Sequence, residues 1–146
     1  MRNAASILFL CLIVSFYSCS DDELDITGEY SITIFKSDCL DSKDDFTYIS
    51  GDNEIDGTIV NFSGSLEFTS NDRLIITENY VFPSFTLFNE TITTTGNYEL
   101  SGSTLTVCMD NDCEDRTLSI IEDKLEIESE EDSDGCIRVI EATKKS

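Results

Sequence analysis

The side chains of this chain that could carry out chemistry are carboxylates, hydroxyls and thiols, because the sequence contains no histidine. Without imidazole there is no Ser-His-Asp or Cys-His nucleophile system and no histidine metal ligand. Adjacent acids such as Asp44-Asp45 are common, but neighbouring side chains of an extended chain point to opposite faces. No pair stands out as the two carboxylates, about 5–10 Å apart, that a glycosidase needs. We therefore expect no catalytic residue, no cofactor and no enzyme activity.

Two of the six cysteines lie at the start of the chain, in and just after an apolar segment. Residues 4–17 form a fourteen-residue run without charge. The run is too short for a bilayer core, which needs about 20 apolar residues, and is typical of the apolar part of a signal peptide. Cys11 lies inside this run, whereas Cys19 follows the small residue Ser18 at its end.

The segment 16–19, Phe-Tyr-Ser-Cys, resembles the lipobox of bacterial lipoproteins, in which a small residue precedes a cysteine that is acylated and becomes the mature N-terminus. The acidic residues that follow are similar to a tract found after this cysteine in some Gram-negative lipoproteins of the cell surface. The resemblance implies a signal peptide at residues 1–18, a lipidated (palmitate-bearing) Cys19, an acidic tether at residues 19–25 and a place at the outer membrane. The alternatives are a protein that faces the periplasm and, if cleavage occurs after Ser20, a soluble secreted protein without Cys19.

Four cysteines remain if Cys19 is lipidated, and an even number in an exported chain indicates disulfide bonds, with three possible connectivities. Cys108 and Cys113 enclose four residues, a spacing that bridges neighbouring strands across a hairpin turn. This pairing leaves Cys39 to bond with Cys136. A four-thiolate metal site is the alternative, but the chain lacks the paired C-x₂-C spacing of such sites.

The chain carries 30 acidic and 9 basic side chains, which gives a formal net charge of −21. Removal of residues 1–18 takes away one arginine and no acid, so the mature chain would carry one more negative charge. Such acidity opposes binding to a phosphate backbone, and we expect a monomer with no nucleic-acid partner. The acidic turn residues Asp110, Asp112 and Asp115 are calcium candidates without EF-hand spacing, and a solvated loop is the alternative reading.

The rest of the chain reads as β-strands, because apolar and polar residues alternate along most of it. Tyr30 and Ile32, for example, alternate with polar neighbours, and Phe85 and Leu87 are expected to begin a strand that continues into residues 91–95. From Ser70 onward, turn-rich segments separate these runs at intervals of roughly ten residues. We expect one domain, residues 26–146, that forms an up-and-down antiparallel β-barrel of about eight strands. In such a barrel the first strand ends where the last begins, so Cys39 and Cys136 would meet.

Three segments of this domain are similar to signature segments of lipocalins and of the lipocalin-like domains in bacterial lipoproteins. They are Ile26–Ile32 with its Gly-Glu-Tyr sequence, residues 95–107 with a Gly-Asn-Tyr hairpin, and the closing strand at residues 137–144. Tyr30 stands where lipocalins have Trp. The resemblance implies a pocket for a small apolar ligand, lined by inward aromatic residues: Tyr30, Phe68, Tyr80, Phe82, Phe85 and Tyr98. The alternative is a barrel filled by its own side chains that acts as a structural or protein-interaction module at the cell surface.

Overall fold

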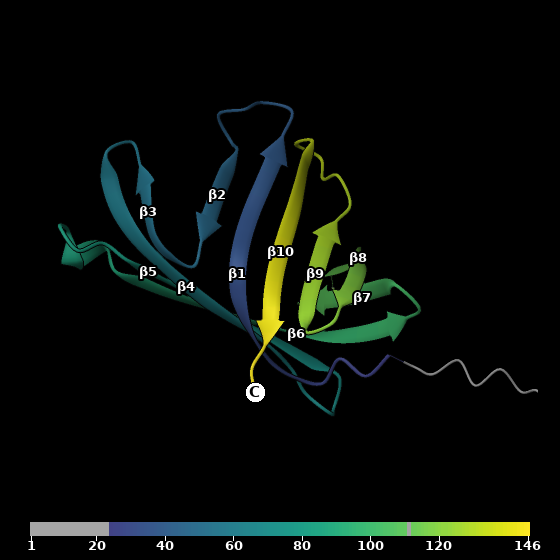
Figure 1. Ribbon diagram of the computed structural model, residues 1–146. Helices are drawn as coiled ribbons and strands as arrows, with labels where there is room; N and C mark the ends of the chain where they lie inside the picture. Colours follow the sequence, from purple (N-terminus) through teal and green to yellow (C-terminus); the bar gives the residue numbers. More distant parts are fainter. Residues whose placement is uncertain (1–23, 111) are drawn as a thin grey trace, which may run out of the picture.

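The computed structural model describes residues 24–110 and 112–146, which form one antiparallel sheet of ten strands (Figure 1). A short 3₁₀ helix, η2 (Thr86–Phe88), lies between the fifth and sixth strands. The strands are β1 (Gly28–Cys39), β2 (Phe46–Ile49), β3 (Gly51–Ile55), β4 (Thr58–Phe68), β5 (Arg73–Val81), β6 (Glu90–Ser101), β7 (Thr104–Met109), β8 (Asp112–Ile121), β9 (Lys124–Ser129) and β10 (Cys136–Lys144).

The sheet closes on itself because β1 pairs with β10 on one edge and with β4 on the other. Strands β4 to β9 each pair with the next strand along the chain, so β1 and β4–β10 form an eight-stranded up-and-down barrel. The predicted fold is therefore confirmed. Closure gives most backbone groups of the wall a ladder partner, which an open sheet of this length could not do at its edges.

The barrel wall divides at its upper end, which is the end of Cys39 and Cys136 in the view of Figure 1. The lower part of β1 pairs with β4, but its upper part pairs with β2, and the upper part of β4 pairs with β3. The side-chain amide of Asn53 on β3 accepts a hydrogen bond from the Ile49 N–H and donates one to the Ile49 carbonyl, both at 2.8 Å. This amide links the two short strands at the place where β1 and β4 have separated.

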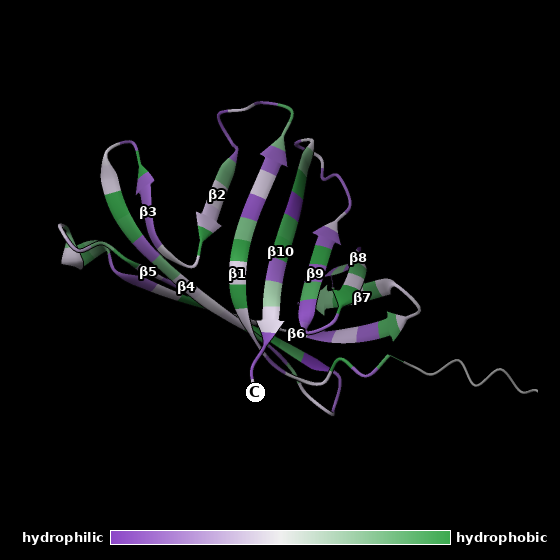
Figure 2. Ribbon diagram, viewed as in Figure 1, coloured by the Kyte–Doolittle hydropathy of each residue, from purple (hydrophilic) through white to green (hydrophobic). Residues whose placement is uncertain are grey.

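Side chains alternate between the interior and solvent along the strands, and the ribbon shows alternating apolar and polar bands (Figure 2). The apolar set packs into a continuous core in the lower half of the barrel, where Leu66 and Leu105 are completely buried. The buried core residues are Ile26, Tyr30, Ile32, Phe62, Leu66, Phe68, Leu74, Leu105, Val107, Leu118, Leu125, Ile127, Ile140 and Ala142.

Residues from both ends of the described chain close the lower end of the barrel. The Tyr30 hydroxyl donates a hydrogen bond to the Ile26 carbonyl at 3.1 Å, which holds the segment before β1 against the core. The Lys144 ammonium lies 5.6 Å from the centre of the Tyr30 ring, a cation–π distance, and Lys145 forms an ion pair with Glu29. These contacts fix the first and last strands to each other.

Both predicted disulfide bonds are confirmed, and each joins residues that lie directly opposite each other on adjacent strands. Cys39 at the end of β1 is bonded to Cys136 at the start of β10, with their Cα atoms 3.9 Å apart. Cys108 of β7 is bonded to Cys113 of β8, with their Cα atoms 4.0 Å apart. The first bond closes the seam between the first and last strands, as the barrel topology predicts.

One predicted strand start was wrong. Phe85 and Leu87 belong to a loop that contains η2, and β6 begins only at Glu90. Pro83 at the start of this loop cannot donate to a ladder, so extended pairing stops there. Within residues 24–110 and 112–146, no helix is long and apolar enough to cross a membrane.

Candidate functional site

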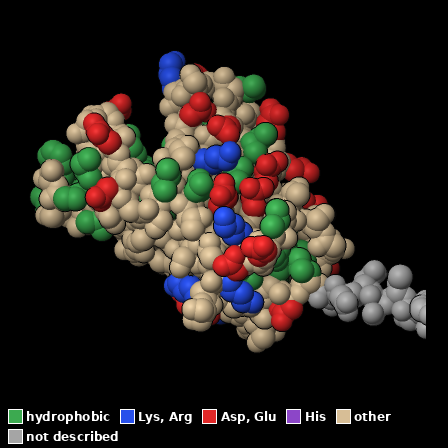
Figure 3. Space-filling view, in the orientation of Figure 1, with side chains coloured by type: hydrophobic (Ala, Val, Ile, Leu, Met, Phe, Trp, Pro, Cys, Tyr) green, Lys and Arg blue, Asp and Glu red, His purple; other side chains and the backbone are tan. Residues whose placement is uncertain are grey.

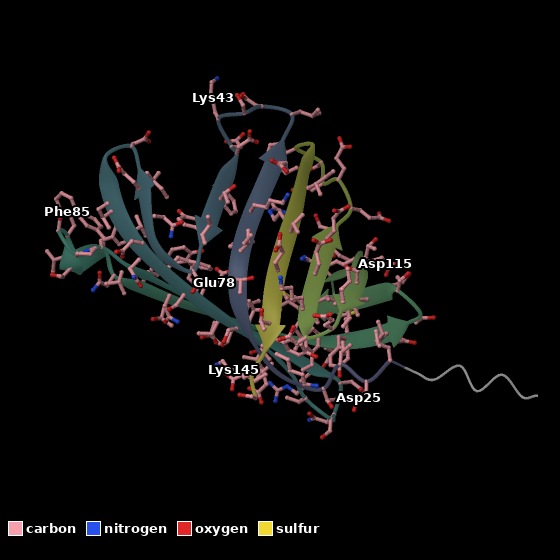
Figure 4. The ribbon with its side chains drawn as sticks, in the orientation of Figure 1. Asp25, Lys43, Glu78, Phe85, Asp115 and Lys145 are labelled. Carbon is pink, nitrogen blue, oxygen red and sulfur yellow. A yellow bond between two sulfur atoms is a disulfide. The ribbon has the colours of Figure 1, made fainter. Side chains whose placement is uncertain are left out.

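The six aromatic residues predicted to line a pocket lie in three different places. Tyr30, Phe68 and Tyr98 pack edge to face in the lower half, with ring centres 5.9 and 5.1 Å apart along the series. Tyr80 lies higher, on the inner face of β5. Phe82 and Phe85 lie beyond the end of β5, in the loop that carries η2, and Phe85 is 53% exposed (Figure 4). The structure therefore does not bring these six residues together into one lining.

A different set of residues faces the interior at the upper end of the barrel, and we call this set the mouth. The ladder registers place each of its side chains on the same face of the wall as the buried core residues. They nevertheless keep partial exposure to solvent, whereas the inward residues Leu66, Leu74 and Leu105 of the lower half are buried. The mouth consists of Phe35, Phe46, Tyr48, Ile76, Glu78, Tyr80, Ile92, Thr94, Met109 and Arg116.

Aromatic rings form one wall of the mouth and rest on the buried ring of Phe62. Tyr48 and Tyr80 each lie on Phe62, with ring centres 5.5 and 5.4 Å from it, and 5.2 Å from each other. Phe35 and Phe46 continue the wall, with their ring centres 5.1 Å apart. These rings come from four strands, β1, β2, β4 and β5, which is why their contact depends on the splitting of β1 from β4.

A carboxyl group lies beside this aromatic wall. The Tyr80 hydroxyl donates a hydrogen bond to Glu78 Oε2 at 3.3 Å, and both side chains point from β5 into the barrel. Burial raises the pKa of the Glu78 carboxyl above its usual value, and the hydrogen bond from Tyr80 offsets this rise only in part. Burial, followed by the nearby Glu78 charge, raises the pKa of the Tyr80 phenol, so the phenol stays protonated at neutral pH.

The only basic side chain of the mouth is Arg116, on β8. Its position opposite Leu105 of β7 and Ser129 of β9 directs the side chain inward, and that side chain is 19% exposed. Its Nη2 donates to Glu114 Oε2 at 2.9 Å, while its buried Nε has no hydrogen-bond partner among the described residues. The mouth thus combines an aromatic wall with the Glu78 carboxyl and with Arg116, whose partner Glu114 lies on the same face of β8.

The other predicted sites remain separate from the mouth. Cys19 lies outside the described residues. Asp115 is exposed and accepts a hydrogen bond from the Thr106 hydroxyl at 2.6 Å, while Asp110 and Asp112 lie at the adjacent β7–β8 turn. Across residues 24–110 and 112–146, no group of three or more His, Cys, Asp or Glu side chains is placed to hold a metal ion.

Sequence reasoning missed most of the aromatic wall. Phe46 and Tyr48 alternate with polar residues, but their strand has only four residues and follows an acidic loop. Phe35 was also passed over, because a register shift in β1 between Ile32 and Ile34 moves the inward face from even-numbered to odd-numbered residues. The short alternation at residues 46–48 was the one signal that could have identified this part of the site.

No family model matches this chain, and no curated protein is significantly similar to it.

Proposed function

We propose that the protein is a binding protein and not an enzyme, and that the mouth of its barrel takes a small apolar ligand. One observation carries the proposal: Ile92 lies on the inward face of β6 and is still 39% exposed, whereas the inward Leu74 and Leu105 of the lower half are buried. Covering exposed apolar surface is favourable by about 25 cal/mol per Å². Small-molecule sites are typically lined by apolar and aromatic side chains with a few polar groups, and the mouth has such a composition.

The filled lower half limits where the ligand would lie. An eight-stranded barrel encloses little more than its own side chains or one small ligand. Because the core fills the interior below Phe62, the proposed ligand contacts the aromatic wall on one side and Ile92 and Met109 on the other. The eight-stranded up-and-down topology supports the resemblance to lipocalin-like domains, which is itself part of this proposal.

A fluorescence titration with the neutral apolar probe N-phenyl-1-naphthylamine tests ligand binding. The purified protein should enhance and blue-shift the probe emission, and Ile92→Glu should weaken probe binding at least tenfold, because it puts a charge into the mouth. Ile121→Glu is the matched control, since Ile121 is 72% exposed and lies on the outer face of β8. Equal weakening by both variants, or no binding to the wild-type protein, would refute the proposal. Native mass spectrometry should also detect a ligand that co-purifies.

We further propose that an acyl chain on Cys19 anchors the protein to the outer membrane, with the barrel at the cell surface. The charge-free run and the Ser-Cys junction support this, and so do the disulfide bonds, which form in oxidising compartments. The first described residue, Leu24, lies at the closed lower end of the barrel, so a short tether from Cys19 would leave the mouth directed away from the membrane (Figure 1).

Mass spectrometry of the mature N-terminus tests the anchor. We expect an acylated Cys19 as the first residue, and we expect Cys19→Ser to move the protein from the membrane fraction to the soluble fraction. An unmodified N-terminus at Asp21 would show that ordinary cleavage occurs and that the protein carries no anchor.

A further inference from the structure

The upper half of β6 has a ladder partner on one edge only. Residues Glu90–Asn97 pair with β5, while pairing with β7 is confined to Asn97–Ser101. The stretch Glu90–Thr95, which we call the free edge, therefore has no strand beside it on the β7 side among the described residues. The barrel is therefore closed where Asn97–Ser101 pair with β7, and the free edge lies beyond this closed part.

The backbone groups that point to the free edge belong to three threonines. The Tyr98 N–H donates to the Asp72 carbonyl, on the β5 side, at 2.8 Å. Because backbone groups of successive residues in an antiparallel strand point to opposite edges, even-numbered residues of β6 bond to β5. Thr91, Thr93 and Thr95 consequently direct their N–H and C=O groups away from β5, to a side where no strand of the described residues pairs with them.

The free edge lacks the features that usually protect an edge strand. Natural edges carry lysines, prolines or bulges, or lie under a helix or loop. The sequence of the free edge is Glu-Thr-Ile-Thr-Thr-Thr, which has high β-propensity and neither lysine nor proline. Its register against β5 runs without a shift over its whole length. Such an edge is a template for one more strand.

The charges around the free edge select a basic partner. The whole chain carries 30 acidic and 9 basic side chains, so its field attracts cations. Glu90, which is exposed, begins the free edge, and Asp112 lies at the start of β8. None of the described ion pairs involves Glu90 or Asp112.

An apolar tip adjoins the upper end of the free edge. Leu87 and Phe88 of η2 are 96% and 67% exposed, and the space-filling view shows hydrophobic side chains gathered on this lobe (Figure 3). Phe82, Phe85 and Phe88 line a hollow there together with Glu90, the first residue of the free edge. A partner that pairs with the free edge would meet this apolar surface at its end.

A second copy of the chain does not fit the free edge. Antiparallel pairing of two β6 strands about Thr93 would place Glu90 of one copy opposite Gly96 of the other. Gly96 lies so close to β7 that a Cβ atom on it would be 2.6 Å from the Cys108 carbonyl oxygen. The loop before Glu90 would therefore collide with the β7–β8 hairpin, and the strong negative charge of both copies would oppose the contact.

We propose that the free edge, Glu90–Thr95, binds an extended basic segment of another protein, which adds to the sheet as an antiparallel strand beside β6. The three threonines supply the backbone hydrogen bonds, the acidic side chains attract the lysines or arginines of the segment, and the apolar tip receives the chain beyond the paired stretch. This inference is independent of the ligand proposed for the mouth.

Fluorescence anisotropy of a fluorescein-labelled Lys-Val-Lys-Val-Lys-Val peptide tests the proposal. The protein is the mature form, isolated from cells and purified in detergent. The wild-type protein should bind this peptide but not a Glu-Val-Glu-Val-Glu-Val peptide. A lysine-valine peptide with every amide N-methylated keeps the charge but has no backbone N–H to donate to the free edge, and it should bind at least tenfold more weakly. If the methylated and unmethylated lysine-valine peptides bound equally well, the interaction would depend on charge alone, and the proposal would be overturned.

Thr93→Pro is the decisive variant. It removes one N–H from the free edge and none from the β5 ladder, and proline is tolerated where the N–H of an edge strand faces outward. We expect peptide binding to fall at least tenfold, while Thr93→Ala, which keeps the N–H, should bind like the wild type. Hydrogen exchange provides a second readout, in which the peptide should protect the Thr91 and Thr93 amides. Unchanged binding by a folded Thr93→Pro variant, absence of that protection, or dimers in sedimentation would overturn the proposal.

Discussion

Separate removal of the two disulfide bonds should destabilise the barrel by different amounts. Cys39–Cys136 joins residues 97 apart in the sequence, whereas Cys108–Cys113 joins residues 5 apart. A disulfide bond stabilises mainly by lowering the entropy of the unfolded chain, and this effect grows with the logarithm of the loop length. At ~25 °C the long loop corresponds to about 4.7 kcal/mol and the short loop to about 2 kcal/mol.

The two alanine double variants, Cys39→Ala/Cys136→Ala and Cys108→Ala/Cys113→Ala, measure this difference. Urea unfolding followed by linear extrapolation should give free energies of unfolding that differ by about 2.7 kcal/mol, with the first variant the less stable. Both bonds join directly opposed residues of adjacent strands, so the geometry of the folded state is closely matched between them. The main structural difference is that Cys136 is buried, which adds some lost packing to the first variant.

Equal losses, or a larger loss for the Cys108–Cys113 variant, would refute the reasoning from loop length. Either result would mean that interactions in the folded barrel, and not the entropy of the unfolded chain, set the contribution of each bond. The wild-type protein with both bonds reduced is the control, and its loss should approach the sum of the two single losses.

Three further predictions concern packing and pH. Leu105→Ala should lower the free energy of unfolding by about 2–5 kcal/mol, because Leu105 is fully buried, whereas Ile121→Ala at an exposed site should stay within about 0.5 kcal/mol in the same urea assay. Folding raises the pKa of Glu78, so the protein loses stability as the pH rises from the unfolded pKa of this carboxyl through its folded pKa. Glu78→Gln should therefore raise the Tm at pH 7 and leave the Tm unchanged below about pH 4. A gain in Tm that persists in acid would contradict burial of the charged carboxylate as the cause. Gly96→Ala should cost about 1–3 kcal/mol because its Cβ would meet the Cys108 carbonyl oxygen, while Thr95→Ala beside it serves as the control for a simple surface change.

The fold class and the Cys108–Cys113 bond could be predicted because both follow from local patterns, and the Cys39–Cys136 bond then followed as the remaining pair. Alternation at Tyr30 and Ile32 predicts a strand with one buried face, and the four-residue spacing of Cys108 and Cys113 predicts a hairpin bridge. The strands β2 and β3 were not predicted, because four or five residues carry too little alternation to stand out in an acidic segment.

The candidate site was predicted only in part, and the reason is register. Of the six aromatic residues expected to line a pocket, only Tyr80 belongs to the mouth. Phe82 and Phe85 lie outside it because the ladder of β5 ends at Val81, before the loop that carries η2. Whether an aromatic side chain faces inward depends on shifts and strand ends that the alternation of a single segment does not encode.

The sequence by itself determined the absence of imidazole chemistry, the large negative charge, the alternation of half-buried strands and the spacing of the cysteines. These are properties of single residues or of short stretches, so they hold before any strand finds its partner. Only the tertiary structure decided that β1 separates from β4, that rings from four strands meet over Phe62, and that no described strand pairs with Glu90–Thr95 on one edge. The physical reason is that strand pairing joins residues far apart in the chain, and the stagger between strands sets which positions meet and which stay unpaired.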